Sequence, residues 1–415
     1  MFEKLNTKRN AFKTKQRQRF RTFLDNNIKE TEGLTKIEKF CAKNFIFIAK
    51  NWNDYCDGDL SKTRTRISLT LKAIIFVVLL KMVVPSISPN DLYIRAIFSD
   101  GTYLLGDNQL ILILCAIGSI VTLITGLLYV YFELKGRLFV VKFLNDIKYK
   151  RNILRLSQRN SNKFCLRLNL INNYAIDQVY KLLSIVSTTI LSGTSVIVYL
   201  QTGSTNLPCL IFWLVNLVIY FLHFWQLLLG GIVIWYIFLI YLKYQFIEIN
   251  ELFENSLKNK NTNSLLNAIL RHKSVEQTVH ELNKMYKILV LIFYLAAVPV
   301  FDLAIFIPSR RDSSIILMCF SSSLGLAALI SMFALNYTCA QIVKTAHKSR
   351  PLLYIFLIES KLSIHHKWKI HEFIEHLSGA EIGFYCLTLF PMNFSTFFDF
   401  IVAAFKNYFL LVKIF

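Results

Sequence analysis

Hydrophobic residues are gathered along this chain into seven blocks, and polar segments separate the blocks. Most blocks are about 20 residues long, the length at which an α-helix crosses roughly 30 Å of hydrocarbon. Within a block the apolar positions show neither the period of an amphipathic helix nor that of a half-buried strand. The pattern therefore predicts an all-α membrane protein with seven transmembrane helices. The blocks are Ile67–Val84, Leu110–Phe132, Ile176–Leu200, Leu210–Leu242, Ile288–Ile307, Ser314–Leu335 and Asn393–Phe415.

Two segments predict helices that extend beyond the bilayer. The fourth block, Leu210–Leu242, would be about 50 Å long at 1.5 Å per residue, which exceeds the hydrophobic thickness of the membrane. The polar segment before the fifth block has apolar residues at helical spacing, so we expect an amphipathic helix that runs straight into the fifth span. We expect these two extensions to pack on each other outside the membrane. The apolar positions of the amphipathic segment are Leu266, Ile269, Val275, Val279, Leu282 and Leu289.

The basic residues indicate how the chain is oriented. A formal net charge of +21 and the basic stretch Lys8–Arg21 would by themselves suggest binding to nucleic acid. However, the segments on one side of the predicted membrane hold 39 lysines and arginines, and those on the other side hold three. The positive-inside rule assigns the basic side to the cytoplasm. We therefore predict a cytoplasmic amino terminus, an extracellular carboxyl terminus, contact with anionic membrane lipid and no nucleic-acid partner.

The blocks divide the chain into four parts. Residues 1–66 form a basic cytoplasmic region, 67–335 six transmembrane helices with cytoplasmic extensions, 336–392 a cytoplasmic anchor segment, and 393–415 the seventh helix. No apolar core follows the first basic stretch, so we expect no cleavable signal peptide. The seven blocks predict a multi-pass protein, and we expect it in the plasma membrane. Glycosylation triplets at Asn336 and Asn393 fall on the predicted cytoplasmic side and are interpreted as chance matches.

One cluster of side chains invites a metal-binding interpretation. The segment His365–His376 holds four of the eight histidines in the chain. Metal ligands on one helix face would be spaced four residues apart, as His371 and Glu375 are, whereas His376 follows His371 by five residues and points elsewhere. We favour a solvated cytoplasmic helix over a metal site. The chain also lacks a phosphate-binding glycine loop, a nucleophile elbow and a paired-carboxylate motif, so we expect neither a cofactor nor enzymatic activity.

Polar residues in the outer halves of the spans are candidates for a ligand pocket. Asp302 lies in the fifth span, and an intramembrane carboxylate is a functional candidate by default. An alternative of equal weight is an ion pair with Lys81, Arg310 or Arg311. The other candidates would line an amphipathic cavity for a small molecule, although each alone is more typical of simple helix packing. These candidates are Tyr199, Trp213, Asn216, Tyr220 and Ser322.

The last helix carries charges at regular spacing. Asp399, Lys406 and Lys413 are seven residues apart, which places them on one stripe of a helix. Charged residues in a span face the interior of a helix bundle or water rather than lipid. The stripe would therefore border an aqueous pore if several copies of the chain meet. Alternatively, the lysines extend to the membrane surface, which is credible for Lys413 near the outer edge.

The same helix resembles the insect chemoreceptor superfamily, which comprises the gustatory and odorant receptors. Gustatory members end in Thr-Tyr, five hydrophobic residues and Gln-Phe. The matching residues here read Asn407-Tyr408, FLLVK and Ile414-Phe415. The segment Phe384–Asn393 is similar to the one that leads into the seventh helix of that family. Arg271–Leu289 is similar in style to the loop before its fifth helix.

The resemblance implies a divergent, gustatory-receptor-like subunit of a homo- or heterotetramer. Its function would be that of a taste or odour receptor, namely a ligand-gated, non-selective cation channel opened by a small organic molecule. The departures from the family pattern are Asn407, Lys413 and Ile414, and a ring of lysines would repel cations. The alternative is therefore a non-conducting or auxiliary membrane subunit whose role need not be sensory. The implied pore-lining residues are Asp399, Lys406, Asn407, Tyr408, Lys413 and Ile414.

Overall fold

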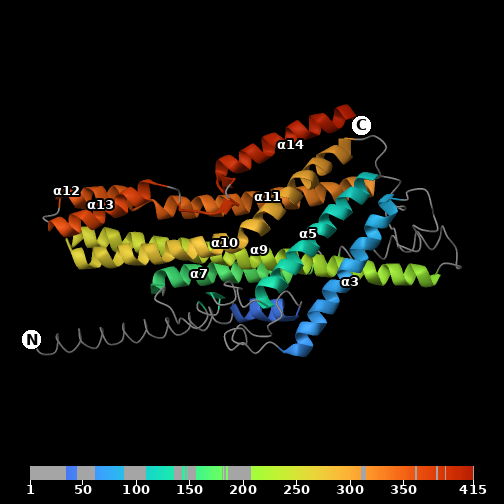
Figure 1. The fold of residues 1–415 in the computed structure, drawn as a ribbon, viewed down its shortest axis with the longest axis horizontal. Helices are drawn as coiled ribbons and strands as arrows, with labels where there is room; N and C mark the ends of the chain where they lie inside the picture. The colour runs from blue at the N-terminus through green and yellow to red at the C-terminus, as the bar shows by residue number, and fades with distance from the viewer. Residues whose placement is uncertain are drawn as a thin grey trace, which may run out of the picture.

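The computed structural model shows an elongated bundle of helices that lie roughly along one axis (Figure 1). Its description covers residues 34–43, 61–87, 109–134, 143–144, 147, 156–179, 181, 184–185, 207–309, 315–359, 362–379, 382–387 and 389–414.

Six of the seven hydrophobic blocks coincide with a helix. The third block, Ile176–Leu200, lies largely outside the described residues. Within the described part of the chain, two helical stretches, Gly230–Lys258 and Thr262–Ser309, are long and apolar enough to cross a membrane. The helical nature of the blocks is thus confirmed where it is described, while the number of spans and their orientation stay predictions. The six helices are α3 (Lys62–Ile87), α5 (Gln109–Leu134), α9 (Leu207–Lys258), α10 (Thr262–Ser309), α11 (Ile315–Ala346) and α14 (Phe394–Ile414).

Two of these helices are far longer than a bilayer requires, as the sequence predicted. Helix α9 has 52 residues and α10 has 48, and α10 runs unbroken from its polar amino-terminal half into the predicted fifth span. The turn between them is tight because Lys260 adopts a positive φ of 47°. Asn261 then caps α10, since its Oδ1 accepts a hydrogen bond from the Ser264 amide at 3.1 Å.

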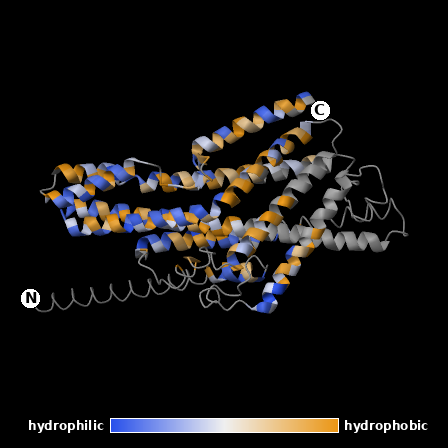
Figure 2. Ribbon diagram, in the orientation of Figure 1, coloured by the Kyte–Doolittle hydropathy of each residue, from blue (hydrophilic) through white to orange (hydrophobic). Residues whose placement is uncertain are grey.

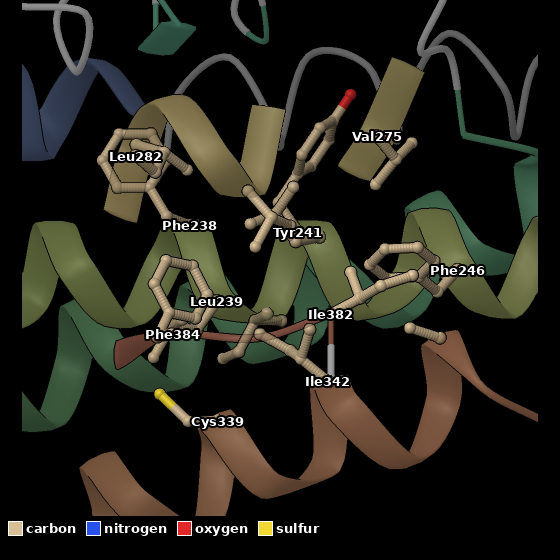
Figure 3. Packing of buried hydrophobic residues seen from close by; sticks show 14 of the residues in the cluster. Phe238, Leu239, Tyr241, Phe246, Val275, Leu282, Cys339, Ile342, Ile382 and Phe384 are labelled. Carbon is tan, nitrogen blue, oxygen red and sulfur yellow. The ribbon is translucent and has the colours of Figure 1, made fainter. Parts of the chain in front are cut away.

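The extensions of α9, α10 and α11 meet two short helices, α12 (Arg350–Glu359) and α13 (Ile364–Ser378), to form what we call the anchor bundle, residues 243–287 and 336–378. Figure 2 shows hydrophilic residues intermixed with hydrophobic ones along this part, as expected for amphipathic helices. The predicted inward face of α10 is confirmed: Ile269, Val275, Val279 and Leu282 are buried. Figure 3 shows Val275 and Leu282 among the buried side chains of the neighbouring helices.

Helix α13 contains the histidine cluster, and its apolar side packs into the bundle. Its buried residues are Ile370, Phe373, Ile374 and Leu377. Glu276 of α10 contacts His376 through both carboxylate oxygens, at 2.7 and 2.8 Å. Among the described residues, no group of three or more His, Cys, Asp or Glu side chains is arranged to hold a metal ion.

Two further helical elements pack against α9. Helix α7 (Gln158–Ile171) continues into a π-helix, η2 (Asn172–Val179), and lies beside α9. The amide of Ser157, just before α7, donates a hydrogen bond of 2.6 Å to Glu248 of α9, and Arg271 of α10 lies 3.4 Å from the same carboxylate. This one side chain therefore joins three elements.

Candidate functional site

A short hairpin leads from the anchor bundle into the last helix. Its strands are β1 (Tyr385–Cys386) and β2 (Phe390–Pro391), and the turn is possible because Leu387 adopts a φ of 56°. The Tyr385 amide donates a hydrogen bond of 3.0 Å to Oδ1 of Asn283 in α10. The hydrophobic pattern does not predict this hairpin. The hydrogen bond to Asn283 fixes it to the middle of α10.

The first turn of α14 is set by a side-chain cap. Oδ1 of Asn393 accepts a hydrogen bond of 3.0 Å from the Thr396 amide, and the Thr396 hydroxyl donates to the Pro391 carbonyl. An asparagine cap satisfies an amide that no residue earlier in the helix could satisfy. The glycosylation triplet at Asn393 thus has a structural role as a helix start.

One face of α14 packs on α10 and α11. Phe397 lies 5.4 Å, between ring centroids, from Phe333 of α11, and Phe400 lies 5.9 Å from Phe301 of α10. Ala404, one turn further on, is fully buried. These residues hold the first half of α14 against α10 and α11.

The charged stripe lies on the other side of α14. Asp399, Lys406 and Lys413 are exposed, as the seven-residue spacing predicted for one helix face. With 3.6 residues per turn, this stripe projects opposite to Phe397 and Ala404. Tyr408 is half-buried, and the side chain of Ile414 is outside the description. The stripe is therefore available to meet water or another copy of the chain.

Asp302 and Asn407, expected to belong to different sites, contact each other. Nδ2 of Asn407 donates a hydrogen bond of 3.1 Å to Oδ2 of Asp302, so a candidate pore residue meets a candidate pocket residue. Asp302 is 5% exposed. This contact gives the carboxylate a neutral partner. The ion pair considered above stays a prediction, because Arg310, Arg311 and the side chain of Lys81 lie outside the description.

The described structure does not test whether the other candidate pocket residues surround Asp302. Ser322 is exposed on α11. Trp213, Asn216 and Tyr220 lie on α9, but their side chains fall outside the description, as does the whole of Tyr199. The pocket itself therefore stays a prediction.

Two contacts that the sequence pattern does not predict fix α10 against α11. The hydroxyl of Tyr294 donates a hydrogen bond of 2.8 Å to buried Asn336. A Cβ atom added at Gly325 of α11 would overlap the Cβ of Ala304, so the two helices approach closely where both residues are small. In the sequence, the only signal for the contact between Tyr294 and Asn336 was an asparagine directly after an apolar block.

A buried histidine lies in the anchor bundle. Nε2 of His272 is 3.1 Å from the carbonyl oxygen of Ala346, and its ring lies 5.1 Å from both Phe246 and Phe373. Burial among these rings disfavours the imidazolium form and lowers the pKa of His272 to about 4, against the smaller raising effect of the Ala346 carbonyl. The residue is therefore neutral at physiological pH.

Comparisons with solved structures show which known fold this arrangement of helices matches. The structure is similar to that of the insect olfactory receptor OR5 from Machilis hrabei in complex with eugenol, with a TM-score of 0.73 and 10% identity, over 94% of this chain and 100% of that chain. This chain has the fold of an insect olfactory receptor. A second structure of the same receptor gives a TM-score of 0.67 at 12% identity, over 86% of this chain and 90% of the other. No protein-family model and no curated protein matches the sequence.

The chemoreceptor resemblance of the last helix is thus confirmed at the level of the olfactory receptor fold. This likeness extends over nearly the whole chain, whereas the likeness in sequence was concentrated at the carboxyl-terminal end. The gustatory subtype stays a prediction.

Proposed function

We propose that this protein is a subunit of a ligand-gated, non-selective cation channel with a chemosensory role. The observation that carries the proposal is the division of α14 into two faces. One face packs on α10 and α11, while the opposite face exposes Asp399, Lys406 and Lys413. A membrane helix with an exposed charged stripe requires a wet or paired environment, and a pore shared among several copies provides one.

The assembly is a tetramer of this chain, with or without related subunits, in the plasma membrane. Four copies of α14 surround the pore, and the anchor bundles of the four chains pack together on the cytoplasmic side. The apolar residues exposed beside the stripe would then contact neighbouring subunits, which removes them from lipid or water. They are Phe398, Val402, Phe405, Phe409 and Leu410.

The ligand is a small organic molecule of the gustatory or odorant type. It binds among the outer halves of the spans, where Asp302 contributes a carboxylate and Tyr199, Trp213, Asn216, Tyr220 and Ser322 supply the other polar groups. The likeness to an olfactory receptor solved with eugenol supports this class of ligand and makes eugenol the first molecule to test.

The proposal is tested by whole-cell recording from cells that express the full chain, with surface expression confirmed by labelling. A panel of small organic molecules that includes eugenol should evoke a cation current absent from untransfected cells. Asp399→Asn should lower the cation preference of that current, because it removes the one acidic position of the stripe. Particle images of the purified protein should show a four-fold assembly. Surface-expressed protein that neither assembles nor conducts would contradict the proposal.

The lysines favour a second candidate function. In a tetramer Lys406 and Lys413 would each form a ring of four positive charges, which repels cations. A chain of this kind would serve as an auxiliary subunit that conducts only beside partners without those charges. Co-expression separates the two functions, since an auxiliary subunit gives current only with a partner and changes that partner's selectivity.

A further inference from the structure

The contact between Asp302 and Asn407 is unusual in its surroundings. Asp302 is 5% exposed in the predicted fifth span, and its Oδ1 has no hydrogen-bond partner among the described residues. Burying a carboxylate with incomplete hydrogen bonding is costly. The single described bond to Asn407 at 3.1 Å therefore matters more than a polar contact at a solvated surface would.

The Asp302–Asn407 hydrogen bond lies where α14 changes from a buried to a largely exposed helix. Phe397, Phe400 and Ala404 fasten the first half of the helix. Beyond Ala404 the side chains are largely exposed: Phe409 is 63% exposed and Leu410 59%. The hydrogen bond from Asn407 thus lies at the border between the half of α14 that packs on α10 and α11 and the half whose side chains are largely exposed.

We infer that the Asp302–Asn407 hydrogen bond is a tie that holds the outer half of α14 against α10 and keeps the pore wide. This inference rests on the proposed function, in which the stripe of Lys406 and Asp399 faces the pore axis. Because the packed face lies opposite to the stripe, a force that draws α14 toward its own α10 draws it away from the axis. Loss of the tie releases the outer half of α14 toward the axis and narrows the pore.

Asp302 also belongs to the region proposed for ligand binding. A ligand that packs beside Asp302 changes the surroundings of the carboxylate that holds Asn407. The tie therefore connects the ligand pocket to the pore helix, and both residues act as positioning residues for gating.

The first test uses ligand-evoked currents. Asp302→Leu and Asn407→Leu each remove the hydrogen bond and should lower basal current and raise the half-maximal ligand concentration about three- to fifteen-fold, the range for a hydrogen bond between membrane helices. The exchange Asp302→Asn with Asn407→Asp keeps a carboxylate facing an amide, so the doubly changed protein should regain more basal current than either leucine variant shows. Ser309→Ala is the control, since among the described residues the Ser309 hydroxyl donates to the Phe306 carbonyl of its own helix.

The second test does not depend on conduction. Spin-labelled noncanonical amino acids are placed at exposed Ser309 on α10 and Val412 on α14, with labelled chains diluted into unlabelled ones. The distance between the labels should lengthen in Asn407→Leu and return in the exchanged pair. If the distance responds but no variant conducts, the tie stands and the proposed function fails. If currents are present but the leucine variants alter neither distance nor ligand response, the tie is overturned.

Discussion

The hydroxyl of Tyr294 in α10 donates a hydrogen bond of 2.8 Å to Oδ1 of Asn336 in α11, and both side chains are buried. The amide of Asn336 in turn donates to the Met332 carbonyl at 2.9 Å, so its orientation is fixed by its own helix. Tyr294 also lies 5.3 Å, between ring centroids, from Phe390 in the hairpin. One side chain thus links α10, α11 and the hairpin that precedes the last helix.

Removal of the Tyr294 hydroxyl should weaken the contact between α10 and α11. We expect Tyr294→Phe to lower the free energy of unfolding by about 1 kcal/mol, since polar contacts between membrane helices are worth roughly 0.6–1.7 kcal/mol. The aromatic ring and its contact with Phe390 are kept. Unfolding of the purified protein in detergent measures the change, with Tyr337→Phe as a control on an exposed tyrosine of α11. Equal stability of the two variants would contradict the assigned role.

The close approach of Gly325 and Ala304 should tolerate a methyl group on one helix only. Gly325→Ala forces α10 and α11 apart, and overpacking of this kind costs about 1–3 kcal/mol. The double variant Gly325→Ala with Ala304→Gly moves the methyl group to the other helix and should recover part of the loss. Thermal unfolding in detergent compares the three proteins. A double variant less stable than Gly325→Ala alone would show that the two sites are not in contact.

The anchor bundle should lose stability in acid because of His272. Its pKa is about 4 when folded and near 6.5 when unfolded, so the unfolded chain binds more protons in between. Stability from the neutral ring is complete above pH 6.5 and falls as the pH drops toward 4, by up to about 3 kcal/mol. His272→Phe should flatten the pH dependence of the denaturation midpoint between pH 7 and 4. The exposed His365→Phe should leave the slope as in the wild type; equal slopes in both variants would rule out His272 as the cause.

The lysines of α14 should control ion selectivity if the stripe faces the pore. A lysine at the bilayer centre costs roughly 2.5–3.5 kcal/mol on insertion scales, so a dry lipid-facing position is unfavourable for Lys406. Lys406→Gln together with Lys413→Leu should increase cation current or reduce anion preference, measured as a shift in reversal potential. Identical permeability in a conducting assembly would mean that the lysines extend to the membrane surface instead.

The sequence by itself determined where the helices lie, because hydropathy and length are local properties of each block. The extended α9, the continuous α10 and the stripe of Asp399, Lys406 and Lys413 all follow from spacing along one helix. The residues of the last helix also carry enough of the family pattern to suggest the chemoreceptor fold by themselves.

Only the tertiary structure decided which of these residues meet. Asp302 and Asn407 are 105 positions apart, and their contact depends on the rotation and crossing of two helices. Apolar side chains specify that a helix face is buried, but many neighbouring faces would bury it equally well. The small residues Gly325 and Ala304, the bond from Tyr294 to Asn336 and the hairpin before α14 select one arrangement. Sequence patterns therefore placed Asp302 and Asn407 in separate sites, whereas packing placed them in one.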